Sequence, residues 1–405
     1  MFGAPDGHQA GPNAGGLGCR AVRVGVGVMI AGASGLPAIV LETALGLHSA
    51  GVPVTLFMTH DAVLPAHAYA LEHSARRLEA LPAPLRNSRI EHALQLPHRL
   101  LLGRRLAAAL ADETIDVLHL FSSALAAVVP ARLPTVVQSW FYPPDLPGRL
   151  RTMMPLAPRG PLAPVRLVGE IQAHAGDLLG YRRAALVLAN TPSAERALRA
   201  RGLPTQHIPP CITVRDQSPD RSQSNVLRLV FAAYNLATPR KGLTLLLEAL
   251  PLLGAGRVHL TLVGAWSDEI AAAVARVRHA GTEVRAVGRL PREHYLEILA
   301  READLFVMPS LYEEWGFALS EALSLGVPVL ALPVYPFADV VDDSVGFLAA
   351  DKTPEAIAAA LERALTDGLP KREDVVSVTR ATLGADAIAP RLIAAYEQVI
   401  SGVGR

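Results

Sequence analysis

The chain has 405 residues, of which 51% are hydrophobic and 19% charged, and its formal net charge is +1. This length predicts two or three domains with a sizeable core. The near-neutral charge and the 5% of aromatic residues argue against a nucleic-acid-binding protein. The two cysteines, Cys19 and Cys211, lie far apart without metal-ligand spacing, so we interpret them as reduced thiols of a cytoplasmic protein.

The chain begins with a stretch rich in glycine and proline, residues 1–20, which we expect to be disordered. It lacks a charged start followed by an apolar core, so we do not expect a secretion signal. Residues 24–41 carry no charge and are long enough to raise the question of a membrane span. Their glycines and proline instead favour a buried strand, a loop and a helix start: Gly25, Gly27, Gly32, Gly35 and Pro37.

Strand and helix patterns alternate through the first half of the chain. The run RVGVGVMI predicts a parallel strand covered on both faces, and IVLETALGLHSAG has the apolar spacing of a helix that ends at Gly51. Further strands are predicted at VPVTLFM, TIDVLHLF, LPTVVQSWF and the end of GYRRAALVLAN. Helices are predicted at RLLLGRRLAAALADE and TPSAERALRARG. We therefore assign residues 21–212 to a first α/β domain.

Residues 213–225, TVRDQSPDRSQSN, are polar and lack an apolar period, so we interpret them as a linker. Strands are then predicted at LRLVFAAY, RVHLTLVG, EVRAVG, LFVMPS and PVLALP. They alternate with helices predicted at LTLLLEALPLL, SDEIAAAVARVRHAG, REHYLEILAREA and ALSEALSLG. This predicts a second doubly wound domain over residues 226–388. Residues 389–405 contain a final helix that we expect to cross back to the first domain.

Two such domains would face one another across a cleft, lined by the loops at the carboxyl ends of their strands. Ser34 and Gly35 follow the first strand, and a loop with so little side-chain bulk lets the backbone approach a pyrophosphate. Lys241 follows Arg240 and precedes a helix start, where a cation and free backbone N–H groups suit phosphate oxygens. Taken alone, this pair is explained equally well as a solvated helix cap.

A third loop lies in PSLYEEWGFALSEALSLGVPVLA, residues 309–331, where Glu313 and Glu321 stand eight positions apart around Gly316. With a helix beginning near Gly316, Glu313 lies in the loop and Glu321 on the second helical turn. Both carboxylates would then face the cleft. Ionised carboxylates only accept hydrogen bonds, which suits the vicinal hydroxyls of a ribose or a hexose. Two unrelated surface charges explain this spacing poorly.

With these residues the sequence resembles the retaining GT-B glycosyltransferases of family GT4, whose E-x7-E block matches Glu313 to Glu321. Glu314 and Trp315 stand where glycine and phenylalanine are usual in the family. Supporting likeness lies in GASGLPAIVLETALGLHSAGVPVTLF, IDVLHLF, TPRKGLTLLLEAL and DDSVGFLAADKTPEAIAAAL. The resemblance covers most of the chain. It implies the α/β GT-B fold, two Rossmann-like doubly wound domains facing a central cleft.

The resemblance also implies where a nucleotide-diphosphate-sugar donor would bind. Lys241 and Glu313 would be catalytic, with Lys241 on the diphosphate and Glu313 on the sugar hydroxyls, while Glu321 would hold the ribose. The other donor-binding positions implied by the family are Ser34, Gly35, Asn235, Arg240, Gly288, Arg289, Leu290, Gly316 and Phe317. Such enzymes use no cofactor and need no catalytic metal, and the sequence contains no D-x-D motif.

Two positions depart from the family pattern. Asn235 stands six positions before Lys241, where arginine is usual, and Trp140 stands where a strand-end histidine is usual. His119 matches a different family histidine, and we place it with Trp140 on the acceptor side. The main hypothesis is a hexosyltransferase that uses a UDP- or GDP-sugar in carbohydrate biosynthesis. A non-catalytic GT-B protein that binds nucleotide sugar and a sugar-nucleotide epimerase stay open as alternatives.

The acceptor would be a hydroxyl group of a polysaccharide, glycolipid or natural product, bound mainly by the first domain. Residues 146–168 contain no acid but carry four arginines and two methionines: Arg149, Arg151, Met153, Met154, Arg159 and Arg166. This segment is open to three interpretations. It is a flexible acceptor loop, a patch that touches the inner face of a membrane, or a plain surface connection.

Overall fold

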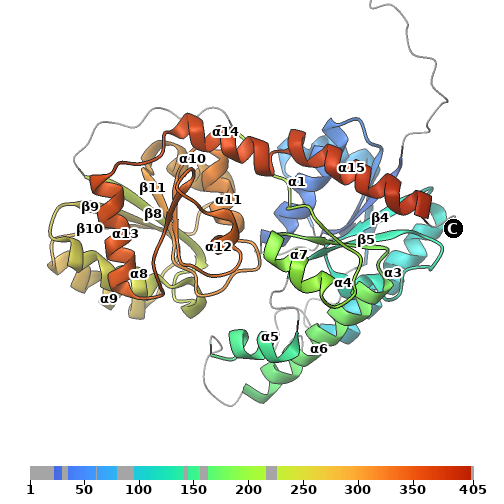
Figure 1. The fold of residues 1–405 in the computed structure, drawn as a ribbon, viewed down its shortest axis with the longest axis horizontal. Helices are drawn as coiled ribbons and strands as arrows, with labels where there is room; N and C mark the ends of the chain where they lie inside the picture. The colour runs from blue at the N-terminus through green and yellow to red at the C-terminus, as the bar shows by residue number, and fades with distance from the viewer. Residues whose placement is uncertain are drawn as a thin grey trace, which may run out of the picture.

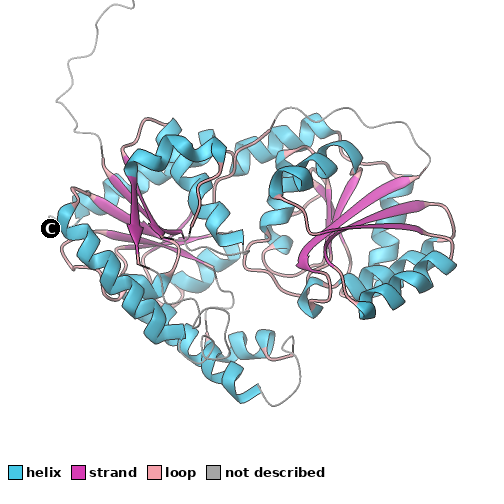
Figure 2. Ribbon diagram, turned by 180° about the vertical axis from the view of Figure 1, so that it is seen from behind, coloured by secondary structure: helices cyan, strands magenta, loops and turns pink. Residues whose placement is uncertain are grey.

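The computed structural model describes residues 22–29, 35–60, 62–79, 95–140, 145–155, 163–215 and 226–402. The expectations for the N-terminal tail, for Ser34 and for most of the linker lie outside these residues. The chain forms two lobes side by side, each built around one parallel sheet with helices on both faces (Figures 1 and 2). This confirms the predicted pair of doubly wound α/β domains.

The first lobe holds a seven-stranded sheet in the order β3-β2-β1-β4-β5-β6-β7. Its strands are β1 (Val24–Met29), β2 (Val54–Thr59), β3 (Ala75–Leu78), β4 (Val117–Leu120), β5 (Thr135–Ser139), β6 (Leu186–Ala189) and β7 (Thr205–His207). Its helices are α1 (Gly35–Ser49), α3 (Gln95–Ala109), α4 (Ser123–Ala126), α5 (Leu146–Met153), α6 (Ala163–Arg183) and α7 (Pro192–Arg199), with short 3-10 segments η1 (Ala66–Ser74) and η3 (Leu110–Asp112). The central strands are buried on both faces, which explains their continuous apolar runs.

The second lobe holds a six-stranded sheet in the order β10-β9-β8-β11-β12-β13. Its strands are β8 (Leu227–Asn235), β9 (Val258–Ala265), β10 (Glu283–Gly288), β11 (Leu305–Met308), β12 (Val329–Ala331) and β13 (Gly346–Leu348). Its helices are α8 (Leu243–Ala249), α9 (Asp268–His279), α10 (Arg292–Glu302), α11 (Phe317–Ser324), α12 (Phe337–Val340), α13 (Pro354–Thr366) and α14 (Arg372–Leu383), with 3-10 segments η4 (Pro239–Lys241) and η5 (Leu250–Leu253), and the chain ends with α15 (Ala385–Gly402). In both sheets the strand order reverses at the first strand, β1 or β8, and ligands bind beside such a switch point.

The last two helices connect the lobes (Figure 1). Helix α14 contacts α11 of the second lobe, and α15 contacts α1 of the first lobe. Ile388, Leu392 and Tyr396 of α15 are buried in one core with Val40 and Leu47 of α1. The C-terminal helix therefore packs as part of the first lobe.

Proline-containing N-terminal caps explain two of the helix starts. The side chain of Thr191 accepts a hydrogen bond from the N–H of Ala194 at the start of α7. Thr353 does the same for Ala356 at the start of α13. Proline follows each threonine at a position where its missing N–H costs nothing. The helix predicted at TPSAERALRARG is confirmed for this reason.

Residues 146–168 differ from the expectation of a long surface connection. Helix α5 begins after Asp145, whose carboxylate accepts the N–H of Gly148 at 2.7 Å, and α6 begins at Ala163. Neither helix was predicted from the sequence, because Pro147 and Pro164 argue against a helix at these positions. Each lies in the first turn of its helix, where proline is tolerated because the N–H there has no partner within the helix.

The expectation of an exposed basic patch in this segment is wrong for Arg149. Its side chain is buried, and its guanidinium pairs with Glu170 and Asp177 of α6, each at 2.7 Å. Arg151 is exposed, whereas the other two arginines of the segment lie outside the side chains that the structure describes. Arg149 therefore fastens α5 to α6 and is not available to a membrane surface or an acceptor.

The uncharged run over residues 24–41 divides into β1 and the start of α1, as its glycines predicted. In the part of the chain that the structure describes, no helix combines the length and apolarity needed to cross a bilayer.

Candidate functional site

Lys241 and Glu313 meet at one edge of the second sheet. Lys241 ends η4, which follows β8, and Glu313 lies in the loop after β11. The ammonium group of Lys241 contacts Oε1 of Glu313. The same oxygen accepts a hydrogen bond from the hydroxyl of Ser310 at 3.1 Å and lies 3.1 Å from Nη1 of Arg240. Strands β8 and β11 are parallel neighbours, so the loops at their carboxyl ends are adjacent.

Glu313 is 6% exposed, and its surroundings favour the ionised carboxylate. Burial alone would raise its pKa, but the charges of Lys241 and Arg240, with hydrogen bonds from Lys241 and Ser310, hold the pKa below its ordinary value. The loops thus present one fixed carboxylate and two cations. Such a set can bind hydroxyl groups and phosphate oxygens side by side.

Two glycines allow these loops to come close together. Gly242 follows Lys241 with φ +70, and a Cβ there would lie 1.8 Å from the carbonyl oxygen of Pro309. Gly316 has φ +84 and precedes α11, and a Cβ there would lie 2.6 Å from the ring of Phe337. Gly316 is the N-cap residue of α11 and has no side chain to cap it, so the first backbone N–H groups of the helix suit an anionic ligand. The helix start predicted near Gly316 is confirmed.

Glu321 takes part in a network that joins the two lobes. Nε of Arg292 donates to Oε1 of Glu321 at 2.5 Å, and Nη2 of Arg292 lies 3.2 Å from Oε1 of Glu42. Glu42 is buried on α1, and its Oε2 accepts the backbone N–H of Thr213 at 3.0 Å and its hydroxyl at 2.5 Å. Burial raises the pKa of Glu321, although Arg292 opposes that rise. The sequence interpretation missed Arg292 and Glu42.

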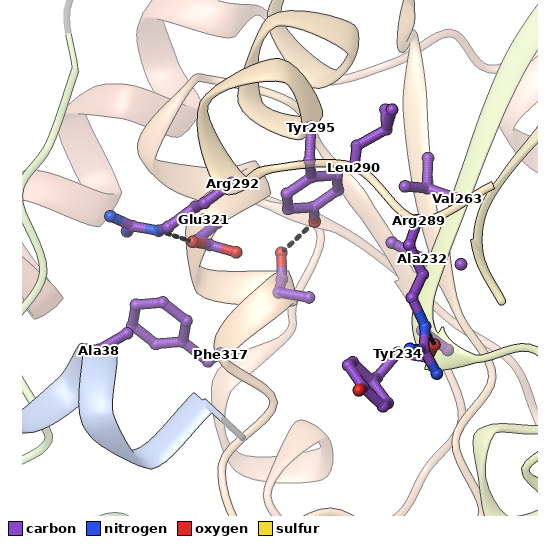
Figure 3. A pocket seen from close by; sticks show the side chains of 13 residues that line it. Ala38, Ala232, Tyr234, Val263, Arg289, Leu290, Arg292, Tyr295, Phe317 and Glu321 are labelled. Carbon is purple, nitrogen blue, oxygen red and sulfur yellow. Dashed lines mark hydrogen bonds and ion pairs between the residues drawn. The ribbon is translucent and has the colours of Figure 1, made fainter. Parts of the chain in front are cut away.

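Glu321 and Arg292 line a pocket of about 440 Å³ beside α11, where they point toward one another (Figure 3). The guanidinium of Arg289 lies 3.8 Å from the centroid of the Tyr234 ring and donates from Nε to the carbonyl of Tyr234 at 3.1 Å. The other lining residues are Ala38, Ala232, Ala233, Val263, Gly264, Leu290, Tyr295, Phe317 and Ala318. Ala38 comes from α1, so both lobes form the pocket. Four of the predicted donor-binding residues meet here: Arg289, Leu290, Phe317 and Glu321.

The remaining predicted donor positions are more scattered. Gly35 begins α1, one turn before Ala38, and Gly288 ends β10 immediately before Arg289. Asn235 ends β8 and is exposed, and its Oδ1 accepts the N–H of Ala237 at 3.0 Å. The structure therefore gives Asn235 a turn-forming contact.

His119 does not face an acceptor. It is 1% exposed beneath α15, with Nδ1 2.8 Å from the hydroxyl of Tyr396 and its ring stacked on Phe121. Burial lowers its pKa to about 3, so the ring is neutral. Nε1 of Trp140 donates to the carbonyl of Phe121 at 2.7 Å. The expectation of an acceptor contact is wrong for His119, and Trp140 packs against the same core.

Across the described residues, no group of three or more histidine, cysteine, aspartate or glutamate side chains is arranged to hold a metal ion. Cys211 is a buried free cysteine. Burial raises the pKa of its thiol to about 12, which keeps it protonated and unreactive.

Two protein-family models match the chain. Residues 214–381 match the glycosyl transferases group 1, and residues 34–210 match the glycosyl transferase 4-like domain. The chain belongs to this glycosyltransferase family. The matched segments contain Lys241, Arg292, Glu313 and Glu321 as well as Glu42. The GT4-like family predicted from the E-x7-E block is thereby confirmed, and the retaining mechanism stays a prediction.

Curated members of the family are similar to part of the chain. A glycogen synthase of Halorhodospira halophila is 35% identical over 139 residues, which is 31% of this chain and 28% of that protein. The O-antigen chain mannosyltransferase B of Escherichia coli is 35% identical over 137 residues, 32% of this chain and 35% of that protein. The matched part of the chain thus spans about a third of the length of these curated relatives.

Solved structures resemble nearly the whole chain in fold. Sucrose-phosphate synthase of Thermosynechococcus elongatus has a TM-score of 0.70 at 20% identity, over 95% of this chain and 100% of that one. Anabaena HepE in complex with UDP and glucose has a TM-score of 0.63 at 16% identity, over 93% and 100% of the two chains. These likenesses confirm the predicted GT-B fold.

Proposed function

We propose that the protein is a retaining hexosyltransferase that moves a hexose from a UDP- or GDP-sugar to a hydroxyl acceptor without a metal or cofactor. The observation that carries the proposal is the meeting of Lys241, Arg240 and Glu313 at one edge of the second sheet. Glu313 lies in the loop before α11, the helix whose Glu321 lines the pocket. Support comes from the similar fold of HepE, whose structure was solved with UDP and glucose.

The nucleoside would occupy the pocket at Glu321. The stacked Arg289 and Tyr234 offer a flat surface against which a base packs, and the carboxylate of Glu321 accepts the hydroxyls of a ribose. The volume of about 440 Å³ lies in the range of small-molecule sites. Phe317 and Ala38 close the wall toward the first lobe.

The diphosphate would lie against Lys241, Arg240 and the uncapped start of α11. As the bond between the anomeric carbon and the diphosphate oxygen breaks, negative charge collects on the leaving group. Fixed cations and backbone N–H groups stabilise that charge. Glu313 holds the sugar hydroxyls. The acceptor oxygen bonds to the anomeric carbon from the face that the diphosphate leaves, and the acceptor proton passes to the departing phosphate.

Donor binding is the first test of the proposal. Thermal unfolding would be followed with UDP, GDP and ADP and with the glucose, galactose and mannose derivatives of each. A matching donor raises the midpoint by mass action. Failure of every nucleotide to raise the midpoint would refute the donor site.

Transfer is the second test, with the matching donor and a panel of hydroxyl acceptors. The expected result is released nucleotide, a product of unchanged anomeric configuration by NMR, and turnover that EDTA does not reduce. Donor binding without turnover on any acceptor would favour the non-catalytic binding protein. Conversion of the sugar without an acceptor would favour the epimerase.

A further inference from the structure

A second cavity, of about 330 Å³, lies between the lobes on the other side of α11. Phe317, Ala318 and Glu321 of that helix line the pocket proposed for the donor, whereas Leu319, Ser320 and Leu323 line this cavity. At 100° per residue, these two sets fall on opposite faces of α11. The cavity is therefore separate from the donor pocket. Its wall also includes the ends of β6 and β7 in the first lobe and parts of α12 and α14 in the second.

Three buried polar atoms in the wall of this cavity have no hydrogen-bond partner among the described residues. They are Nδ2 of Asn190, Nε1 of Trp315 and Oγ of Ser320. These residues are 0%, 4% and 1% exposed. Folded proteins satisfy almost all buried polar groups, because a group without a partner has lost its hydrogen bonds to water. Three residues that line one cavity thus each carry a buried polar group that still has hydrogen-bonding capacity.

The orientation of Asn190 is fixed by its neighbours. Nε2 of Gln138 donates to the carbonyl of Ile208 at 3.1 Å and to Oδ1 of Asn190 at 2.6 Å. Because a backbone carbonyl only accepts, the Gln138 amide has one possible orientation, and Asn190 must turn its oxygen toward it. The amide N–H groups of Asn190 then have no partner among the described residues.

The three groups call for an oxygen-rich ligand. The Asn190 amide nitrogen and the Trp315 indole nitrogen only donate, and the Ser320 hydroxyl both donates and accepts. The apolar Leu319 and Leu323 beside them suit the C–H face of a sugar ring. The volume far exceeds the roughly 10–15 Å³ that one water molecule needs and lies at the lower end of small-molecule sites.

The charges around the cavity favour a neutral ligand. Its one arginine, Arg391, is exposed and donates to the carbonyl of His207 at 2.6 Å. Asp339 and Asp342 add two exposed carboxylates to the wall, which disfavours an anion. We propose that this cavity binds a neutral, hydroxyl-rich small molecule, a sugar or polyol, through Asn190, Trp315 and Ser320. Such a ligand contacts both lobes and the loop that carries Glu313.

The proposal is tested on the full chain by isothermal titration with D-glucose, D-galactose, D-mannose and sorbitol. Ser320→Ala and Trp315→Phe each remove one cavity hydrogen bond and keep most of the packing. Ser324→Ala is the matched control, because Ser324 lies on the same helix and its hydroxyl already donates to the carbonyl of Glu321 at 2.7 Å. We expect saturable binding of at least one probe, at least about fivefold weaker in both cavity variants and unchanged in the control.

Binding of the probe must also persist with saturating UDP, since the two pockets are separate. Displacement by UDP, equal affinity in wild type and Ser320→Ala, or no saturable binding of any probe would each overturn the proposal. Tighter binding of sulfate than of any neutral probe would overturn the ligand class. A failed donor site is distinguishable, because it appears as a loss of stabilisation by nucleotides whatever the sugars do.

Discussion

Nη2 of Arg292 lies 3.2 Å from Oε1 of Glu42, although 250 residues separate the two along the chain. Glu42 belongs to α1 of the first lobe, and Arg292 opens α10 of the second lobe. Arg292 also holds Glu321, the carboxylate proposed for the ribose. The placement of the lobes and the shape of the pocket proposed for the donor are therefore coupled through one arginine.

Replacing Glu42 tests how much this link stabilises the fold. Glu42→Gln keeps the size of the side chain but removes the charge that Arg292 and Thr213 contact. Hydrogen bonds to a charged group contribute about 1.5–3 kcal/mol, so the free energy of unfolding should fall by about that amount. Denaturant unfolding followed by circular dichroism measures it.

Glu302→Gln is the matched control, because Glu302 pairs with Arg285 on the surface, where both side chains are about half exposed. Surface pairs contribute little to stability, so its unfolding midpoint should not shift. Equal shifts in the two variants would mean that the link between the lobes contributes no more than a surface pair.

Lys241→Ala tests the proposed stabilisation of the leaving diphosphate. Loss of one well-placed cation should lower kcat by about 10²–10³ with the donor found by thermal shift. Lys352→Ala, which removes an exposed lysine of the same lobe, should leave kcat unchanged. Glu313→Ala should also abolish transfer, but it leaves Lys241 buried without its carboxylate, so its folding must be verified first. Wild-type rates in both site variants would refute the assignment.

Arg292→Met should make nucleotide binding sensitive to pH. Burial raises the pKa of Glu321, and Arg292 opposes that rise, so its loss should raise the pKa further. The ribose hydroxyls need the ionised carboxylate, which is present above that pKa and protonated below it. As the pH is lowered, the affinity of the variant for UDP should therefore begin to weaken at a higher pH than that of the wild type, as measured by titration calorimetry. A Glu321→Gln, Arg292→Met double variant should lose this extra dependence.

The long strands and many of the helices were predictable because periodicity and caps are local properties of the chain, whereas the short strands β3, β7 and β13 were not predicted. The E-x7-E block was predictable too, since Glu313, Gly316 and Glu321 lie within one loop and helix. What the sequence pattern missed were pairings between distant positions. Arg149 pairs with Glu170 and Asp177 of the next helix. Arg292 pairs with Glu42 of the other lobe. Spacing in a single sequence reports neighbours along the chain and carries no information about partners that only the fold brings together.

His119 shows the same limit, since its partner Tyr396 lies 277 residues away on α15. Its burial makes stability depend on pH. Burial lowers the pKa of His119 to about 3 in the folded chain, against an ordinary value of 6.5. Below pH 6.5 the unfolded chain therefore binds a proton that the folded chain does not. Stability must fall as the pH falls from 6.5 toward 3. From this residue the loss between about pH 7.5 and about pH 5 is about 2 kcal/mol.

Denaturant unfolding at a series of pH values measures this slope. His119→Gln removes the titrating group, so its unfolding free energy should fall less steeply with acid than that of the wild type. Tyr396→Phe removes the hydroxyl but keeps the ring that covers His119, so it should be less stable yet keep the wild-type slope. Burial is the main cause of the lowered pKa, and this second variant preserves it. A slope in His119→Gln as steep as that of the wild type would place the titration at another residue.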